Sequence, residues 1–438
     1  MPSKKSQGRL LRQTAIVLNT PFALYRTLGK KIFVVPTYWA DKEAMQRLYS
    51  PVHLPADTIS SRQLNVVVMI LESFGKEYSE YLNKDRNGGT YKGYMPFLDS
   101  LMKEGLTYTY SFANGRKSID GLPSVCSGIP MFVEPFISTP ASLNTLSSFA
   151  GELKKKGYYT SFFHGAKNGS MGMEAYTHIS GFTDYYGRTE YNNDNDFDGY
   201  WGIWDEEFLQ YFAHTLSTFQ QPFASGIFTL SSHHPFHVPA RYKNKFSEGK
   251  IPIHPCIEYS DYALKRFFET VSREPWFENT LFVITADHTN QSMYEEYRTG
   301  SGLFAVPILF YHPNSNLQGL MDTAIAQQID IMPTILGYLG YDKPYISFGC
   351  DLFHTSPENT FAVNYFNGAY QYFKGDYLLQ FDGEKTIAVY RFKTDELLKE
   401  NLLKEIDSAV RERMENELKA IIQQYMERMV NDELTILE

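Results

Sequence analysis

From residue 65 onward, short apolar runs alternate with stretches of helical periodicity. Runs of five to eight residues, rich in β-branched and aromatic side chains, predict buried strands at 66–71, 159–163, 223–230, 281–285 and 307–311. Between and after them, the spacing of apolar residues predicts helices at 94–104, 122–128, 143–156, 205–216, 257–272 and 329–340. This alternation predicts an α/β fold with a mostly parallel central sheet and helices on both faces.

The two ends of the chain differ from the middle in composition and in the pattern of apolar residues. Residues 1–62 mix basic and apolar residues with several prolines, which predicts short helices and an extended basic linker. Residues 63–356, which contain the alternating strands and helices, form the predicted main domain. Residues 357–438 are predicted to form a small C-terminal α+β subdomain, an antiparallel sheet with a packing helix. Its aromatic strand patterns and charged helix fall at 361–366, 370–379, 386–392 and 395–431.

Composition and charge narrow the class of protein. The 438 residues are 43% apolar and 21% charged, as in a folded globular chain. The net charge of −9 argues against nucleic acid as a partner. Residues 1–31, however, contain seven basic residues and no acid, so this segment is a candidate for contact with an anionic membrane surface or a solvated leader. The apolar run 66–71 is too short to span a bilayer.

Polar residues with catalytic potential follow four of the predicted strands. Glu72, His164 and His233 each stand at or just after a strand end, and the pair Asp287 and His288 follows the strand 281–285. Any one of these residues alone is more often structural. Because the carboxyl ends of parallel strands share one edge of a sheet, we expect these side chains to converge.

The loop 111–121 adds a candidate nucleophile. It is rich in Gly and Ser and contains Ser118 shortly before a predicted helix, whose free N–H groups favour an anion. A serine hydroxyl becomes a good nucleophile when a base or a metal ion activates it. A divalent cation held by the strand-end carboxylates and imidazole would provide that activation. A capping serine in a polar loop is the alternative interpretation of Ser118.

An ordered series of motifs resembles a known family. The series ILES, GRKSIDGLPSVxSGIP, FFHG, LSSHHPF and ITADHT is similar to that of the lipoteichoic acid synthase group of phosphoglycerol transferases, within the alkaline phosphatase and sulfatase superfamily. The resemblance covers about residues 62–355. It implies a metal site and a set of catalytic and substrate-contacting side chains. The implied metal ligands are Glu72, Ser118, Asp287 and His288; Ser118 is also the nucleophile, and His164, His233, Arg116 and Ser292 are assigned to catalysis or substrate binding.

The resemblance also implies cofactor, partners and location. One divalent metal is expected, Mn²⁺ before Mg²⁺ or Zn²⁺, because carboxylates with one imidazole and a hydroxyl suit these ions. The implied donor is a phospholipid such as phosphatidylglycerol, and the acceptor a glycan or glycerol-containing hydroxyl. Residues 18–28 are similar to the stretch that follows the family's membrane helices. We therefore expect a domain at the extracytoplasmic face of the bacterial cytoplasmic membrane, anchored by helices absent from this chain.

Departures from the family pattern leave alternatives open. Ser118 replaces the threonine of the best-known members and keeps the hydroxyl, whereas residues 165–171 lack the family's Asp, Trp and Arg along the glycerol site. Phosphoethanolamine transfer and phosphodiester or phosphate hydrolysis therefore remain alternatives, as does a non-catalytic lipid- or glycan-binding relative. Sulfatase activity is disfavoured, because Ser118 is not followed by the Pro and Arg that formylglycine formation requires. A cytoplasmic mutase is disfavoured by residues 18–28.

Overall fold

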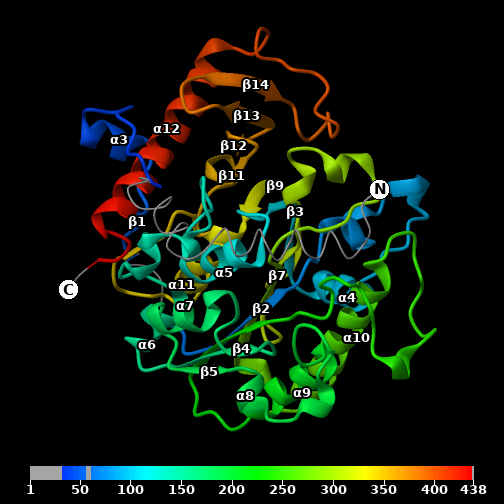
Figure 1. Cartoon of the computed structure of the whole chain (residues 1–438). Helices are drawn as coiled ribbons and strands as arrows, with labels where there is room; N and C mark the ends of the chain where they lie inside the picture. The colour runs from blue at the N-terminus through cyan, green and yellow to red at the C-terminus, as the bar shows by residue number, and fades with distance from the viewer. Residues whose placement is uncertain (1–31, 56–60, 437–438) are drawn as a thin grey trace, which may run out of the picture.

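The computed structural model describes residues 32–55 and 61–436, arranged as one large sheet between helices with a smaller sheet beside it (Figure 1). The basic segment 1–31, with the linker resemblance at 18–28, lies outside the described residues. Within the described ranges, no helix is both long and apolar enough to cross a bilayer.

The central sheet has eight strands in the order β5-β4-β6-β2-β7-β8-β3-β9. The first five of these run parallel, β8 runs antiparallel to both of its neighbours, and β3 pairs in parallel with β9. This arrangement confirms the predicted mostly parallel α/β fold. The strands are β2 Asn65–Leu71, β3 Leu106–Phe112, β4 Tyr159–His164, β5 Asp184–Tyr186, β6 Phe223–Phe228, β7 Thr280–Ala286, β8 Ile308–Tyr311 and β9 Gly319–Gln327.

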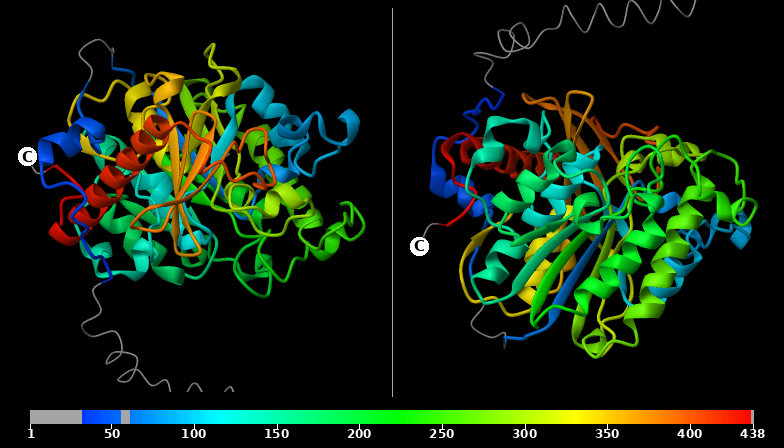
Figure 2. Two further views of the ribbon diagram at one scale, coloured as in Figure 1. Left: turned by 90° about the horizontal axis from the view of Figure 1, so that it is seen from above. Right: turned by 60° about the horizontal axis from the view of Figure 1, so that its bottom comes forward.

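Both faces of this sheet are buried under helices. In β2, Val66, Val68 and Ile70 face one core cluster, and the residues between them face the other. This two-sided burial explains why the strand is apolar at consecutive positions. Helices α4, α9 and α10 cover one face, and α5, α6, α7 and α11 lie on the other (Figures 1 and 2). Their bounds are α4 Pro96–Glu104, α5 Ser118–Ser127, α6 Phe149–Lys154, α7 Met173–Ile179, α9 Asp205–Leu216, α10 His254–Val271 and α11 Ile331–Tyr338, with a short α8 at Arg188–Tyr191.

The register of the parallel strands brings their carboxyl ends into one row. Leu71 of β2 pairs with Ala286 of β7, and His164 of β4 pairs with Phe228 of β6, which in turn pairs with Ile70. The residues that follow these pairs therefore emerge side by side at one edge of the sheet.

A four-stranded antiparallel sheet follows the large one in sequence and lies beside it (Figure 1), as predicted. Helix α12, Ser408–Asn431, packs against β12 and β13. Near the start of the described chain, helix α3, Lys42–Leu48, also contacts α12, and β1 pairs with β10. The division at residues 62 and 356 stays a prediction. The four strands of the small sheet are β11 Phe361–Phe366, β12 Ala369–Lys374, β13 Tyr377–Phe381 and β14 Thr386–Tyr390, and the separate pair is β1 Val52–His53 with β10 Tyr345–Ile346.

Several predicted element bounds were wrong. The helix predicted at 122–128 already begins at Ser118, and the helix predicted at 143–156 begins only at Phe149, where the Ser148 hydroxyl accepts the N–H of Gly151. The last helix begins at Ser408 rather than at residue 395, because the Asp407 carboxylate caps the N–H groups of Ala409 and Val410. The predicted strand 370–379 is two strands joined by a turn with Gly375 at positive φ.

Strands β3 and β9 were not predicted. β3 has the sequence LTYTYSF, in which hydroxyl residues interrupt the apolar pattern. Two of these hydroxyls are buried because they donate to backbone carbonyls, Thr107 to Ile308 O at 2.8 Å and Ser111 to Val306 O at 2.6 Å. The first half of β9 is largely exposed at the sheet edge, so it carries no apolar run.

Candidate active site

The neighbouring ends of β2 and β7 deliver a cluster of three buried ligand-type side chains. Glu72 follows β2, and Asp287 and His288 follow β7. One ligand atom from each of the three lies within 4.8 Å of the others. His288 Nε2 is 3.1 Å from Asp287 Oδ2 and 3.9 Å from Glu72 Oε1. The predicted convergence of these strand ends is thus present in the structure.

Ser118 adds a hydroxyl group to this cluster. It is the first residue of α5, and its hydroxyl donates to Glu72 Oε2 at 3.1 Å and lies 3.5 Å from His288 Nε2. The sequence placed Ser118 before the helix; the structure places it in the first turn. There the unpaired N–H groups and the positive end of the helix favour an anionic group such as a phosphate.

The loop before α5 is held in shape by Asp120. Its Oδ2 accepts the backbone N–H groups of Arg116 and Lys117, at 3.0 and 3.1 Å. Asn114 ties the start of the loop to the C-terminal sheet, since its side-chain amide donates to Val363 O at 2.7 Å. The position of Ser118 therefore depends on contacts from both sheets.

Close packing of α5 against β7 requires a glycine at position 121. A Cβ atom added there would lie 2.9 Å from Asp287 Cα, Cβ and O. Helix and strand end therefore approach each other more closely than any side chain allows. This contact sets the distance between the Ser118 hydroxyl and the ligands on β7.

Replacing Gly121 with alanine is expected to destabilise the protein by about 1–3 kcal/mol, because the helix must move away from Asp287. The same movement displaces Ser118, so turnover is expected to fall with stability. Denaturant unfolding and turnover of Gly121→Ala test this. Gly75→Ala is the matched control, since a Cβ at Gly75 meets its neighbours at an ordinary 3.6 Å. Wild-type stability and turnover in Gly121→Ala would contradict the packing argument.

Backbone contacts orient the three ligands toward a common point. His288 Nδ1 lies 2.7 Å from Thr289 O, and a carbonyl only accepts, so Nδ1 carries the proton and Nε2 presents a lone pair. Asp287 Oδ1 accepts the N–H groups of Ser73 and His288, both at 2.7 Å. Asp287 Oδ2, in contrast, is buried without a hydrogen-bond partner among the described residues. An unpartnered carboxylate oxygen beside an imidazole lone pair and a second carboxylate fits a divalent cation.

The charges of the cluster agree with this fit. Burial, followed by the charge of Glu72, raises the pKa of Asp287 to about 8. Burial also raises the pKa of Glu72, but His288, His233 and the Ser73 hydroxyl outweigh it, and the pKa falls below its ordinary value. Two carboxylates that cannot both ionise comfortably are stabilised by a cation between them.

The two predicted catalytic histidines reach the same edge of the sheet. The buried His164 donates Nδ1–H to Phe228 O at 3.1 Å, and its Nε2 has no partner among the described residues. Burial lowers the pKa of His164, so its ring is neutral at pH 7. His233 is half-buried, and Ser232 before it donates its hydroxyl to Glu72 O at 2.5 Å. Both histidines thus stand at the edge of the sheet where β2 ends and Glu72 lies.

Arg116 and Ser292, predicted to contact substrate, lie in different surroundings. Arg116 is half-buried beside the Phe366 ring at 5.7 Å, and its Nε has no partner within the described chain. Ser292 donates its hydroxyl to Tyr297 O at 3.3 Å and also contacts Glu77. No interaction among the described residues joins Ser292 to the cluster. The roles of both residues stay predictions.

Two residues that support the cluster were not singled out in the sequence. Ser73 donates its hydroxyl to Glu72 Oε1 at 2.5 Å and has a positive φ of 61°. Gln328 donates to the carbonyls of Ala286 and Asp287 at 2.6 and 2.8 Å. Ser73 stands in the ILES motif and was open to assignment, whereas Gln328 lies in no quoted motif and is found only through the fold.

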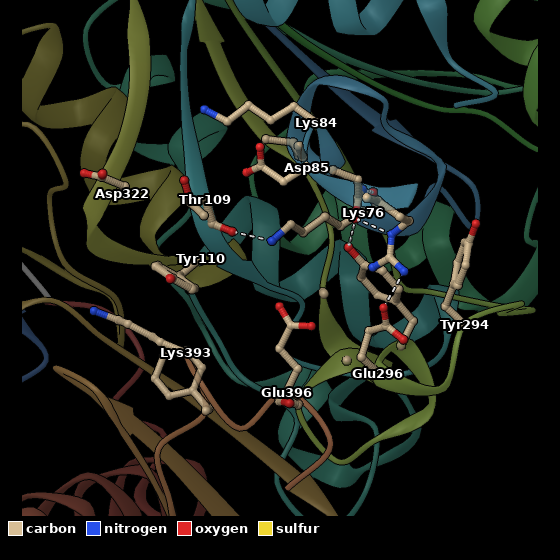
Figure 3. Close-up of a pocket in the computed structure, with 18 of the residues that line it drawn as sticks. Lys76, Lys84, Asp85, Thr109, Tyr110, Tyr294, Glu296, Asp322, Lys393 and Glu396 are labelled. Atoms are coloured by element: carbon tan, nitrogen blue, oxygen red, sulfur yellow. Dashed lines mark hydrogen bonds and ion pairs between the residues drawn. The ribbon is translucent and has the colours of Figure 1, made fainter. Parts of the chain in front are cut away.

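A separate cavity of about 910 Å³ lies between the central sheet and the chain that leaves the small sheet (Figure 3). Lys76 Nζ points into it and donates to Thr109 O at 2.6 Å, and burial lowers the pKa of Lys76 to about 8. Lys393 and Glu396 form another part of its wall. None of the cluster residues lines this cavity, so the large hollow and the candidate active site are distinct.

Comparison with known proteins gives a family match and a named relative. The sequence model of the sulfatase family matches residues 64–341, more than half of the chain. Lipoteichoic acid synthase 1 from Bacillus subtilis is 25% identical over 372 residues, which cover 78% of this chain and 55% of that protein. The chain spans about half the length of the curated relatives it matches.

Two solved structures share the fold. A protein of the alkaline phosphatase superfamily from Vibrio parahaemolyticus has a TM-score of 0.78 at 24% identity, covering 91% of this chain and 98% of that one. The lipoteichoic acid synthase LtaP from Listeria monocytogenes has a TM-score of 0.71 at 21% identity, covering 89% and 98%. The predicted resemblance and fold class are confirmed, and the chain belongs to the sulfatase family of enzymes.

Proposed function

We propose that this protein is a metal-dependent phosphotransferase that moves phosphoglycerol from a membrane phospholipid to an acceptor hydroxyl. The observation that carries the proposal is the Ser118 hydroxyl, 3.1 Å from Glu72 Oε2 and at the N-terminus of α5. A hydroxyl at a helix N-terminus and beside a metal-type cluster suits attack on a phosphodiester. The similarity to proteins named lipoteichoic acid synthases supports phosphoglycerol as the transferred group.

Glu72, Asp287 and His288 would hold the metal, with the Ser118 hydroxyl as a fourth ligand. Mn²⁺ is the proposed ion, with Mg²⁺ and Zn²⁺ as alternatives, because the donor set combines two carboxylates, an imidazole and a hydroxyl. When bound, such an ion acts as a Lewis acid that lowers the pKa of a hydroxyl and neutralises charge on phosphoryl oxygens.

The residues of the site account for two successive transfers. In the first, Ser118 Oγ gives its proton to Glu72 Oε2, which accepts its hydrogen bond, and forms a bond to phosphorus; the bond to the diacylglycerol oxygen breaks, and that oxygen takes a proton from His233. In the second, the acceptor oxygen forms a bond to phosphorus and its proton passes to His233, while the bond to Ser118 Oγ breaks and Oγ takes its proton back from Glu72. The half-buried ring of His233 suits a proton shuttle. The neutral His164, with its free Nε2 lone pair, accepts a hydrogen bond from a head-group hydroxyl.

The remaining expectations belong to the same proposal. The donor would be phosphatidylglycerol, the acceptor a glycan or glycerol-containing molecule, and the site of action the extracytoplasmic face of the bacterial cytoplasmic membrane. Ser118 is followed by Ile119, Asp120, Gly121 and Leu122, without the Pro and Arg of a formylglycine motif, so sulfate ester hydrolysis is not proposed. The family name reflects common ancestry and a shared fold. Which leaving group the enzyme uses depends on the residues of the site.

A panel of donors tests the proposed chemistry. The protein is incubated with Mn²⁺ and one of three donors: micelles of phosphatidylglycerol, matched micelles of phosphatidylethanolamine, or dissolved p-nitrophenyl sulfate. Release of diacylglycerol is measured for the lipids and release of nitrophenol for the sulfate ester. We expect diacylglycerol release from phosphatidylglycerol and its loss after chelation with EDTA. Preferred cleavage of phosphatidylethanolamine would move the assignment to phosphoethanolamine transfer. Turnover of the sulfate ester alone would overturn the proposal.

A further inference from the structure

The loop between β5 and α9 presents two exposed aromatic side chains beside the candidate active site. Tyr200 and Trp201 are 63% and 40% exposed, although both ring types are usually more buried. The Trp201 ring lies edge-on to His233, with centroids 4.2 Å apart. Since Ser232, the residue before His233, donates its hydroxyl to Glu72 O at 2.5 Å, and Glu72 accepts from Ser118, Trp201 borders the place where transfer occurs.

This loop is rigidly built. The carboxylate Oδ1 of Asp198, a buried residue, accepts three successive backbone N–H groups, those of Tyr200 and Trp201 at 2.7 Å and that of Gly202 at 3.1 Å. Trp201 Nε1 donates to His234 O at 2.5 Å. On the side of β4, Ile203 N donates to Gly165 O at 3.0 Å, directly after His164. The two rings are therefore held in place before any ligand arrives, which lowers the entropic cost of binding.

The surroundings favour a neutral polyol ligand. The segment 187–204 contains four acidic residues and one arginine, so it disfavours a phosphate polymer as the ligand of this loop. The immediate neighbours of Trp201 are imidazoles and a carboxylate-bound turn, which an acyl chain would leave without hydrogen-bond partners. A sugar ring is neutral and also satisfies these polar neighbours, because its C–H face packs on an aromatic ring and its hydroxyls form hydrogen bonds with polar groups.

His233 connects this aromatic surface with the proposed transfer reaction. Its Nδ1 lies 3.1 Å from His234 O, which accepts only, so Nδ1 carries a proton, and Nε2 holds a lone pair once it has protonated the diacylglycerol oxygen. A hydroxyl of a sugar packed on Trp201 is placed to donate to that lone pair. We propose that the Asp198–Trp201 loop is an aromatic platform that holds a sugar ring of the acceptor against His233.

The proposal rests on the proposed function and makes the acceptor a glycan. In the transfer step the sugar oxygen bonds to phosphorus, its proton passes to His233 Nε2, the bond from phosphorus to Ser118 Oγ breaks, and Oγ takes its proton back from Glu72. Asp198 is a positioning residue, because it acts by holding Trp201. In the proposed function His164 binds the head group of the donor, so His164 and the platform serve different substrates.

The test separates acceptor use from donor cleavage. Wild-type, Trp201→Ala and Trp201→Phe proteins receive phosphatidylglycerol micelles, Mn²⁺ and either methyl β-D-glucoside or glycerol as acceptor. Diacylglycerol release reports donor cleavage, and mass spectrometry quantifies each transfer product. We expect Trp201→Ala to lower kcat/KM for transfer to the glucoside by about 10-fold, with a smaller loss for glycerol, and Trp201→Phe to retain most of it.

Control variants distinguish a platform from a loop needed only for folding. Asp198→Ala is expected to reproduce the Trp201→Ala pattern, and Asp198→Asn, which keeps one acceptor oxygen, to rescue it. Trp39→Ala removes another partly buried tryptophan, one whose backbone N–H donates to Gln423 Oε1 on α12, and should leave the ratio of the two products unchanged. Equal losses of diacylglycerol release and glucoside transfer in Trp201→Ala would overturn the proposal.

Binding without turnover keeps the platform testable if the proposed function fails. Saturation-transfer NMR of methyl β-D-glucoside should show signals from its ring C–H protons with wild-type protein and none with Trp201→Ala. Wild-type protein that cleaves no phosphatidylglycerol but still gives this pattern would refute the proposed donor and support the platform. Absence of any sugar signal with wild-type protein would refute the platform itself.

Discussion

Replacing Ser118 with alanine is expected to lower turnover by about 10⁴-fold or more, the scale of losing a covalent nucleophile. The Ser118 hydroxyl is the group at 3.1 Å from Glu72 Oε2 that can attack phosphorus, and alanine leaves a methyl group there. The metal should still bind through Glu72, Asp287 and His288, because Ser73 and Thr289, which orient these three side chains, keep their contacts. Turnover assays and calorimetric titration with Mn²⁺ measure the two effects separately.

Two matched variants sharpen this experiment. Ser118→Thr keeps the hydroxyl and should retain substantial activity. Ser124→Ala removes another buried serine of α5, whose hydroxyl donates to Asp120 O and Ile129 O, and should affect stability more than turnover. Substantial residual turnover in Ser118→Ala would end the assignment of Ser118 as nucleophile.

Replacing Asp287 with asparagine is expected to abolish metal binding without destabilising the metal-free protein. The amide oxygen can still accept the N–H groups of Ser73 and His288, which Asp287 Oδ1 accepts at 2.7 Å. The amide nitrogen replaces Oδ2, the oxygen without a partner, and removes its negative charge from beside Glu72. Metal affinity should fall by more than the roughly 100-fold typical of outer-shell changes, and turnover should fall with it.

Thermal unfolding with and without Mn²⁺ measures this effect. The wild-type protein should gain about 2.7 kcal/mol at a metal concentration of 100 times Kd, and Asp287→Asn should gain nothing. Asp261→Asn is the matched control: Asp261 is also buried with a raised pKa, about 7, and also accepts two backbone N–H groups, but lies on α10 away from the cluster. A full Mn²⁺ response in Asp287→Asn would rule out the proposed ligand set.

The sequence predicted the strands that carry the ligands because their pattern has a single cause. β2 and β7 are buried on both faces, so their residues are apolar at consecutive positions, and the polar residue after each run marks the strand end. In-register pairing of Leu71 with Ala286 then places Glu72 beside Asp287. Parallel strands impose this alignment, which is why residues more than two hundred positions apart could be grouped from the sequence.

Other parts of the site depend on contacts that no local pattern records. β3 was not predicted, because its buried hydroxyl groups donate hydrogen bonds to the backbone carbonyls of a distant segment, those of Ile308 and Val306. The start of α5 at Ser118 depends on the Asp120 carboxylate that holds the preceding loop. The exposed position of Trp201 follows from three N–H groups converging on Asp198, a turn that composition does not reveal.

The central claim is that Ser118 carries the transferred group, and a trapped covalent adduct tests it most directly. The protein is mixed with phosphatidylglycerol and Mn²⁺ without an acceptor, quenched in acid within seconds, digested and analysed by mass spectrometry. The account predicts one phosphoglycerol group on the peptide that contains Ser118, present in wild-type protein and absent from Ser118→Ala. Diacylglycerol release without any adduct, or an adduct on another residue, would contradict it.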